Sequence, residues 1–443
     1  MTVAVVGGGL SGLFTAIGLI ELGLDDVLVL EESEEQGGAT KTIQRDGFSL
    51  EPAVGTMTLP HPQMSPILAR IEADMSQVDP VASVRYVYTG DRMVEIPATP
   101  KALMAPILPP GAKIRALAEL LLRSSPESDD ESLQQFCRRR FGKRAGDMLA
   151  WLMASGVYAG DPVRLSARSA FPVLTGLEDR HRSVLRGALR RRGDRAPEGA
   201  RPLPHVPVGG MRALTGAAAK YLGDRFRGGF EVSSVRQTGG GWVVDGPETL
   251  TVDRVVVTTR PEIAARVIGD DLARHLTTAG AAPVVVVGIG GHANPSPLPP
   301  GFGVLIGPGS GLVSLGMLFE SSYAPGRAPE GSWLMKVIGG GATRPDVVDW
   351  DDERLIEVVG DEASRLLGAN LDVGFAEVIR HSPGIPQYDV GHGQWLASLQ
   401  ELLSANPGLH LTGWGYRGVG ASQLATDAAK VAEAVAISYG EAG

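Results

Sequence analysis

The chain has 443 residues, of which 43 % are apolar and 21 % are charged, and it carries a formal net charge of −9 at pH 7. This length predicts two or three substructures rather than one simple core, and the negative charge argues against general nucleic-acid binding. The single cysteine, Cys137, excludes an internal disulfide and a cysteine metal cluster, so we expect no metal site. No apolar run approaches the roughly 20 residues of a membrane-spanning helix. The chain begins directly on a strand, so we expect no signal peptide and a cytoplasmic location.

The chain starts with the order strand, glycine turn, helix, strand and acidic residue. Apolar runs at 3–6 and 27–30 flank a helix-like stretch at 13–22, and the turn at 7–12 reads Gly-Gly-Gly-Leu-Ser-Gly. This is the spacing of a βαβ dinucleotide-binding unit.

Each glycine of this unit has a physical task. Gly7 permits the tight turn, Gly9 lets the backbone approach a pyrophosphate, and Gly12 lets helix and strand pack closely. The helix N-terminus offers free N–H groups to the phosphates, and Glu31 is an acceptor for ribose hydroxyls. The residues predicted to bind the cofactor are Gly7, Gly9, Leu10, Ser11, Gly12, Glu31 and Glu32.

The residues after the acidic position favour FAD over NAD. The chain continues through a second glycine turn, Gly37-Gly38, to Lys41 and Thr42. In many flavoproteins such a turn passes under the pyrophosphate and is followed by a basic residue and a hydroxyl. We therefore add these four residues to the predicted FAD site.

Strand and helix patterns share the middle of the chain. A strand-like segment at 84–88 precedes a helical pattern from about 101 to 195, where apolar residues keep a three- and four-residue spacing. The stretch 196–207 is rich in Pro and Gly and is interpreted as a linker. Beyond it we expect helices over 208–222 and 354–367, and strands near 232, 242–244, 255–259, 284–287, 302–306 and 333–338.

A second strand–turn–helix closes the chain. A strand ending at Gly413 leads into the glycine turn 416–420 and an alanine-rich helix over about 425–437. The N-terminus of this helix would face the flavin pyrophosphate or stabilise negative charge on the reduced flavin. The residues predicted to contact FAD here are Gly413, Tyr416, Gly418, Val419 and Gly420. Both chain ends then belong to one nucleotide-binding domain, and the middle is an insertion.

Over nearly its whole length the chain resembles the protoporphyrinogen oxidase family, FAD enzymes of haem biosynthesis within the amine-oxidase-like flavoproteins. The specific matches are GVYAGD at 156–161 and IPQYDVGH at 385–392. Further matching segments lie at 85–90, 170–172, 181–183, 209–211, 301–303 and 416–420.

The resemblance implies an α/β fold of three domains. These are a Rossmann-like FAD-binding domain (1–75, 202–262 and 402–443), a β-sheet substrate-binding domain (76–95 and 263–401) and an inserted helical, membrane-associating domain (96–201). A basic run lies in the last domain, and on one helix Arg182, Arg186 and Arg190 would share a face toward anionic lipid headgroups. Peripheral contact with the cytoplasmic membrane is therefore expected.

The resemblance also implies the reaction. Protoporphyrinogen IX loses six electrons in three two-electron rounds and becomes protoporphyrin IX, while oxygen reoxidises the flavin and gives hydrogen peroxide. No catalytic side chain is assigned, because flavin N5 takes the hydride and the protein has only to hold the macrocycle in an apolar slot. The family's propionate-binding arginine falls on Arg85. Phe302 and Leu305 would sandwich a pyrrole ring, and Gly156 and Val337 would line the slot.

The expected partners are a porphyrinogen, molecular oxygen, a membrane surface and a second copy of the chain, with no nucleic acid. Val232 would contact the adenine side of FAD through its backbone. Coproporphyrinogen III stays open as a substrate, although its four propionates would require more basic rim residues. Amine oxidation also stays open, since Lys336 lies in a predicted inner strand.

Several residues depart from the family pattern. Ala53-Val54-Gly55 stands where relatives have Gly-Pro, and Ser155 and Trp414 replace an arginine and a small or polar residue. Ala421-Ser422-Gln423-Leu424 stands where relatives often have Asn-Asp-Cys-Ile. These positions lie near the expected flavin and substrate edges, so a paralogue acting on another reduced heterocycle, or a non-enzymatic flavoprotein, is an alternative.

Overall fold

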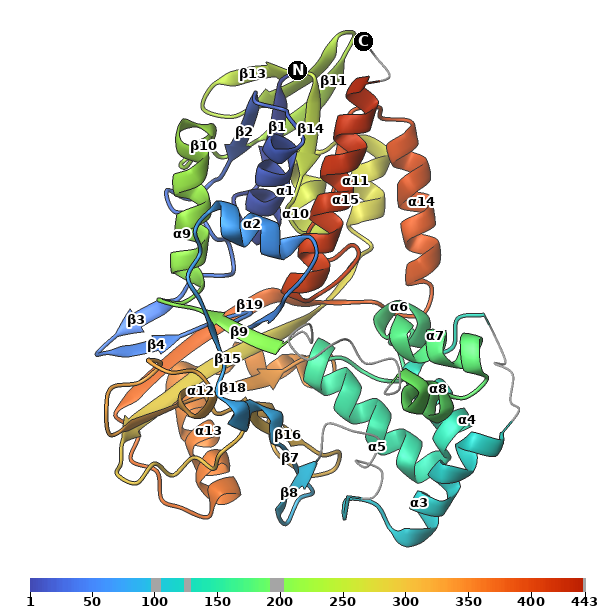
Figure 1. Cartoon of the computed structure of the whole chain (residues 1–443), viewed down its shortest axis with the longest axis vertical. Helices are drawn as coiled ribbons and strands as arrows, with labels where there is room; N and C mark the ends of the chain where they lie inside the picture. Colours follow the sequence, from blue (N-terminus) through green and yellow to red (C-terminus); the bar gives the residue numbers. More distant parts are fainter. Residues whose placement is uncertain (97–104, 123–128, 192–202, 441–443) are drawn as a thin grey trace.

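The structure is a computed structural model that describes residues 1–96, 105–122, 129–191 and 203–440. Its elements form three regions (Figure 1). A parallel sheet flanked by helices lies at the top, a large and mostly antiparallel sheet lies at the lower left, and a group of helices lies at the lower right. The first strand and the last helix both belong to the top region. The predicted α/β fold class is confirmed.

The top region is built on five parallel strands in the order β10-β2-β1-β14-β20. Their bounds are β1 Val3–Val6, β2 Val27–Leu30, β10 Phe226–Arg227, β14 Arg254–Val257 and β20 Leu409–Leu411. Valine dominates the central strands because both faces of a parallel sheet are covered. Val3 and Val5 join the core on one face, and Ala4 and Val6 join the core on the other, as the two-residue period of a strand requires.

Helices and a small sheet cover the two faces. One face carries α1 Leu10–Glu21, α2 Met64–Arg70, α9 Met211–Leu222 and α15 Ala421–Gly440. The other carries α10 Pro261–Val267, α11 Asp270–Leu276, α14 His392–Ser404 and the sheet of β11 Ser234–Thr238, β12 Gly241–Asp245 and β13 Thr249–Val252. The short η5 Gly223–Arg225 leads into β10.

The lower-left sheet has seven strands in the order β19-β15-β18-β17-β16-β7-β8. Their bounds are β7 Arg85–Tyr88, β8 Met93–Ile96, β15 Gly280–His292, β16 Gly303–Ile306, β17 Ser314–Leu318, β18 Ser332–Gly340 and β19 Phe375–Gln387. All neighbours are antiparallel except β16 and β7, which run parallel. Helix α13 Asp352–Leu367 packs on one face of this sheet. Shorter pieces near this sheet are η1 Pro80–Ser83, α12 Glu320–Tyr323 and η6 Pro345–Asp349, and both α12 and η6 contact the inner strand β18.

The end of the predicted linker is a strand. β9 Leu203–Pro207 lies between β5 Met57–Leu59 and β6 Met75–Gln77 and pairs antiparallel with both. Pairing with two neighbouring strands satisfies backbone groups of β9. A Pro-rich sequence does not predict such a strand, because proline lacks an N–H to donate. Residues 196–202 of the predicted linker lie outside the described residues. A separate hairpin joins β3 Ile43–Arg45 to β4 Phe48–Leu50.

The lower-right region contains α3 Pro110–Leu117, η3 Ala118–Leu121, α4 Leu133–Phe141, α5 Lys143–Met153, α6 Ala167–Ala170, α7 Pro172–His181 and α8 Val184–Arg191. Ser132 begins α4 with a capping box, its hydroxyl accepting from Gln135 N while the Gln135 side chain accepts from Ser132 N. One π-helical turn, η4 Ala154–Tyr158, follows α5 and brings Gly156 to the seven-stranded sheet.

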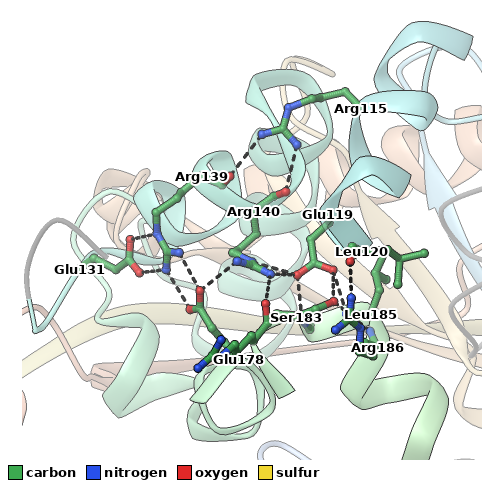
Figure 2. A network of polar contacts seen from close by, with 12 residues as sticks. Arg115, Glu119, Leu120, Glu131, Arg139, Arg140, Glu178, Ser183, Leu185 and Arg186 are labelled. Carbon is green, nitrogen blue, oxygen red and sulfur yellow. Dashed lines mark hydrogen bonds and ion pairs between the residues drawn. The ribbon is translucent and has the colours of Figure 1, made fainter. Parts of the chain in front are cut away.

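A buried polar network joins these helices (Figure 2). The fully buried Glu119 carboxylate pairs with Arg140 and accepts from Ser183 Oγ at 2.6 Å, Val184 N at 2.8 Å and Leu185 N at 3.2 Å. The last two donors are first-turn N–H groups of α8, which have no partner within the helix itself. Glu119 therefore fixes the N-terminus of α8 against η3.

The predicted arginine face is interrupted. α7 ends at His181, and Arg182 follows in a left-handed conformation with a φ of 58°, so Arg182 does not share a helix with Arg186 and Arg190. Arg186 donates to Leu120 O at 2.7 Å. The prediction of one continuous face was wrong because the break at 182–183 cannot be read from charge spacing alone.

Candidate functional site

A cavity of about 390 Å³ lies at the carboxyl ends of the parallel strands. Ligands bind at this edge of open α/β sheets. Gly7 and Glu31 follow β1 and β2, Thr258 follows β14, and Trp414 lies beyond β20. The remaining wall comes from segments around residues 37–40, 53–54, 380–383 and 419–424.

The geometry of the first glycine turn matches the tasks given to each glycine. Gly7 has a φ of +104°, which a residue with a side chain rarely adopts. A Cβ on Gly12 would lie 1.9 Å from Gly7 O, so this position requires glycine for packing. A Cβ on Gly9 would meet only Gly37 O, at 4.0 Å, and therefore would project into open space beside the N-terminus of α1.

Glu31 is held in place at the second strand end. Its carboxylate is buried and accepts Gly8 N at 2.6 Å and Ser33 N at 3.1 Å. It still lines the cavity, and a carboxylate has room for further donors. Glu32, which is exposed, lines the cavity beside it.

Nine of the predicted FAD residues line this cavity: Gly7, Gly9, Leu10, Ser11, Glu31, Glu32, Gly37, Gly38 and Val419. Thr40, which precedes Lys41, lines it as well. Lys41, Gly12, Thr42, Val232, Gly413, Tyr416, Gly418 and Gly420 do not line it. Several of these residues have packing or turn roles instead.

Four of these residues illustrate such roles. The Thr42 hydroxyl contacts the Glu51 carboxylate and accepts from Arg212 N. Tyr416 is fully buried in the core on one face of the parallel sheet, and Val232 belongs to the same core. A Cβ on Gly413 would lie 2.4 Å from Thr258 O, so the missing side chain allows the segments after two strands to approach closely. Its φ of +113° also favours glycine.

Several residues that line the cofactor cavity were not predicted from the sequence. Thr258 and Thr259 follow a valine run, and the carboxyl end of that parallel strand was a usable signal. His381 lies on β19, far along the chain, and no local pattern announces it. Burial lowers the pKa of His381, and its hydrogen bond to Pro52 O opposes that shift.

The cavity fits a dinucleotide. Gly9 leaves open space at the N-terminus of α1, where a pyrophosphate binds. The Thr259 hydroxyl lines the cavity and is buried with no hydrogen-bond partner in the part of the chain that the structure describes. A buried hydroxyl without a partner is costly, and a ligand atom would satisfy it.

A second cavity, of about 180 Å³, lies on the seven-stranded sheet. It brings together four of the five residues predicted to bind substrate: Arg85 on β7, Gly156 on η4, and Phe302 and Leu305 around β16. A Cβ on Gly156 would lie 3.1 Å from Leu305 Cδ2, so the glycine keeps the cavity open at this point. The interior is mostly apolar, and Arg85 is its charged residue.

The fifth residue, Val337, points the other way. Its side chain is fully buried in the core between the sheet and α13. The next residue of β18, Ile338, lines the cavity instead. The prediction for Val337 was wrong by one position, and a shift of one residue along a strand moves the side chain to the opposite face.

Within the described residues, no group of three or more His, Cys, Asp or Glu side chains is placed to hold a metal ion. A search of the same residues finds no helix both long enough and apolar enough to cross a membrane. Cys137 is buried in the helical core, and burial raises the pKa of its thiol.

Comparison with known proteins gives a consistent picture. The family model described as flavin containing amine oxidoreductase matches residues 10–429. The chain is 28 % identical to the coproporphyrinogen III oxidase of Bacillus subtilis (strain 168), over 99 % of this chain and 98 % of that protein. It is also 28 % identical to the chloroplastic protoporphyrinogen oxidase of Nicotiana tabacum (97 % and 84 % covered) and to the protoporphyrinogen oxidase of Homo sapiens (94 % and 94 %).

Solved structures share the fold. A protein from Exiguobacterium sp. 255-15, described as a candidate protoporphyrinogen oxidase, superposes with a TM-score of 0.84 at 20 % identity over 99 % of both chains. A reduced UDP-galactopyranose mutase superposes with a TM-score of 0.76 at 18 % identity, over 98 % of this chain and 95 % of that one. At these identities the likeness establishes the architecture.

Proposed function

Because the chain belongs to the flavin-containing amine oxidoreductase family, and is therefore an oxidoreductase that uses FAD, we propose that it oxidises protoporphyrinogen IX to protoporphyrin IX. The main support for this class of substrate is the chemistry of the second cavity, on the seven-stranded sheet. Its walls are mostly apolar, and the exposed Arg85 guanidinium stands at it with no hydrogen bond or ion pair to any described residue. A macrocycle with an apolar body and carboxylate side chains has the complementary chemistry.

The names of the relatives support this class. The plant and human relatives are protoporphyrinogen oxidases, and the match to them extends over most of both chains. The net reaction removes six electrons and six protons from the porphyrinogen and reduces three molecules of oxygen to three of hydrogen peroxide.

The chain's own residues bind and orient. When bound, FAD supplies the ring that accepts hydride, and Gly9, Glu31 and the N-terminus of α1 would hold its pyrophosphate and ribose. Arg85 would form paired hydrogen bonds with a propionate, and Phe302 and Leu305 would pack on a pyrrole ring.

Coproporphyrinogen III is the second candidate substrate. It is favoured by the Bacillus subtilis relative, which the chain covers over 98 % of its length. The two porphyrinogens differ in the number of carboxylates that the cavity rim has to accommodate, four against two.

Amine oxidation is less well supported by the residues. Lys336 lines neither cavity, because its ammonium group is occupied by two backbone carbonyls and Glu320. Trp414 is the one Trp, Tyr or Phe among the described residues that line the cofactor cavity, so an aromatic cage is absent from that part of the wall.

The direct test is anaerobic mixing of the FAD-loaded protein with each porphyrinogen in turn. We expect the flavin absorbance to bleach and porphyrin fluorescence to appear above the autoxidation blank when air is admitted. The ratio of kcat/KM values then identifies the preferred substrate. A flavin that bleaches with neither porphyrinogen would overturn the proposed substrate class.

We also propose that the helical region contacts a membrane surface. Ile114, Leu117 and Leu121 on α3 and η3 are exposed, Leu121 to 85 %, and Leu189 on α8 is half exposed. Isolated exposed apolar residues are ordinary, but Leu121 and Leu189 lie on η3 and α8, which Glu119 joins (Figure 2), and Ile114 and Leu117 lie on α3, directly before η3. Flotation with vesicles that contain anionic lipid tests the proposal, and Leu121→Asp should reduce binding. Equal binding by both proteins would contradict it.

A further inference from the structure

The segment from Glu51 to Ala53 leads into the wall of the cofactor cavity. Ala53 and Val54 line that cavity. Three successive carbonyl oxygens of the segment are each held by a side chain. Lys336 Nζ donates to Glu51 O at 3.1 Å and to Ala53 O at 3.2 Å, and His381 Nε2 lies 3.0 Å from Pro52 O. Because a carbonyl only accepts, Nε2 of His381 carries a proton in this contact.

The Lys336 ammonium also forms a buried ion pair in this place. Its third partner is Glu320, with Nζ 3.1 Å from Oε1. Lys336 and Glu320 are 6 % and 1 % exposed. Two backbone carbonyls and this carboxylate surround the ammonium, and Lys336 lines neither cavity. The lysine therefore acts on the backbone of the segment rather than on a ligand.

The same cluster reaches the nucleotide-binding region. Glu51 is fully buried, and its Oε1 accepts Arg327 Nη1 at 2.6 Å and Met211 N, at the start of α9, at 3.0 Å. Arg327 Nε lies 3.9 Å from Glu320 Oε2. Two carboxylates and two cations thus close a buried cluster of zero net charge between α9 and β18.

β18 also reaches the second cavity. Lys336 and Ile338 are two residues apart on this strand and therefore point to the same side of the sheet. Ile338 lines the second cavity, while Lys336 holds the segment that forms part of the first. One strand thus carries a contact to each cavity.

We propose that Lys336 is a positioning residue that fixes the 51–54 segment and so sets the cofactor-cavity wall relative to the strand that carries the substrate contact Ile338. The inference rests on the proposed function of the two cavities. Displacement of reacting groups by about 1 Å can lower the rate on the order of a hundredfold. A buried charge cluster that fixes the cavity wall therefore has a direct effect on catalysis.

The test compares two double variants that each neutralise both members of a buried ion pair. Each also removes one further ion pair, Arg327–Glu320 in the first variant and Arg140–Glu178 in the second. Lys336→Met/Glu320→Gln removes the pair beside the cavity wall, and Glu119→Gln/Arg140→Met removes a fully buried pair in the helical region (Figure 2). Neutralising both partners avoids an uncompensated buried charge. Lys336→Arg serves as the conservative variant, since it keeps a cationic donor for the carbonyls.

The readouts are FAD titration and the visible flavin bands, neither of which requires a substrate. We expect Lys336→Met/Glu320→Gln to raise the dissociation constant of FAD roughly tenfold, which corresponds to about 1.4 kcal/mol, and to shift the bands. The Glu119→Gln/Arg140→Met variant should keep the wild-type FAD affinity and flavin bands. The Lys336→Arg variant should keep most of the wild-type affinity and a similar spectrum.

The opposite pattern would overturn the proposal. If Lys336→Met/Glu320→Gln loses thermal stability but keeps the wild-type FAD affinity and bands, Lys336 is only part of the core. If the wild-type chain binds FAD normally but oxidises no porphyrinogen, the proposed substrate fails while the role of Lys336 in the cofactor-cavity wall is still measured. Wild-type protein that binds no FAD would overturn both.

Discussion

The Arg85 guanidinium carbon lies 5.5 Å from the centroid of the Phe302 ring, at the cavity on the seven-stranded sheet. The pair arises from strand register, because β7 and β16 run parallel with Arg85 opposite Gly303, the residue after Phe302. A guanidinium over an aromatic ring keeps its in-plane N–H groups available for a carboxylate.

Arg85→Ala should therefore weaken substrate binding without affecting the cofactor. A hydrogen bond between charged groups contributes about 1.5–3 kcal/mol, so KM should rise roughly 10- to 150-fold. Steady-state kinetics and the flavin spectrum of the same sample provide the check. Arg85→Lys should fall between the two proteins, since an ammonium lacks the paired donors. Loss of FAD from the alanine variant would show that the assignment of Arg85 is wrong.

Two glycines of the first turn should respond differently to valine. Gly9→Val projects into open space beside α1, so the chain should fold and fail to bind FAD. Gly12→Val places a Cβ 1.9 Å from Gly7 O, so the chain should not fold stably. Circular dichroism with FAD titration distinguishes the outcomes. Stoichiometric FAD in purified Gly9→Val protein would refute the assignment of the pyrophosphate site.

Neighbouring residues of β18 offer a matched pair. Val337→Thr buries a hydroxyl in the core, which costs about 1–3 kcal/mol when unpaired, so the melting temperature should fall while KM stays constant. Ile338→Thr changes a residue that lines the second cavity, so KM should rise with little loss of stability. The reverse result would place the substrate on the other face of the sheet.

The part of the candidate cofactor site formed by residues 3–31 was predictable because its geometry is local. Residues 3–31 contain the strand, the turn, the helix and the acidic residue in one continuous stretch, and the required glycines follow from backbone sterics. The same reasoning identified the strand and turn before α15, although that helix begins at Ala421 rather than near 425.

The rest of the site depends on contacts between distant residues. Glu51, Lys336 and His381 meet through a loop and two strands of the large sheet, and each sequence neighbourhood alone resembles an ordinary strand or loop. The sequence also does not show which side of the sheet a residue faces when every residue of the strand is apolar. Within the run from 333 to 338, only the tertiary packing decides that Ile338 rather than Val337 faces the cavity.

The buried pair in the helical region should dominate local stability. Arg140→Met leaves the Glu119 carboxylate buried without its cation, which should lower the free energy of unfolding by about 3–5 kcal/mol. The Glu119→Gln/Arg140→Met double variant should be less destabilised than Arg140→Met, because no unpaired charge remains. Urea denaturation of the three proteins measures the order. A double variant less stable than the single one would show that Glu119 acts mainly through its bonds to α8.

The last prediction concerns acid stability and His410 on β20. Burial, helped by the positive charge of Arg254, lowers the pKa of His410 to about 4, and its Nε2 is buried with no partner among the described residues. In the unfolded chain the pKa of a histidine is about 6.5. Between pH 6.5 and pH 4 the unfolded chain therefore binds a proton at this residue and the folded chain does not. Stability must fall as the pH drops from about 6.5 toward 4 and level off below.

For these two pKa values the loss between pH 7 and pH 5 amounts to about 2 kcal/mol. His410→Gln keeps a polar side chain of similar size that does not titrate, so this part of the pH dependence should disappear from the variant. Free energies of unfolding of both proteins at pH 7 and pH 5 isolate the contribution, because the other histidines titrate equally in both. Identical pH dependence would mean that the pKa of His410 is the same in the folded and the unfolded chain, and hence that water reaches its ring at β20.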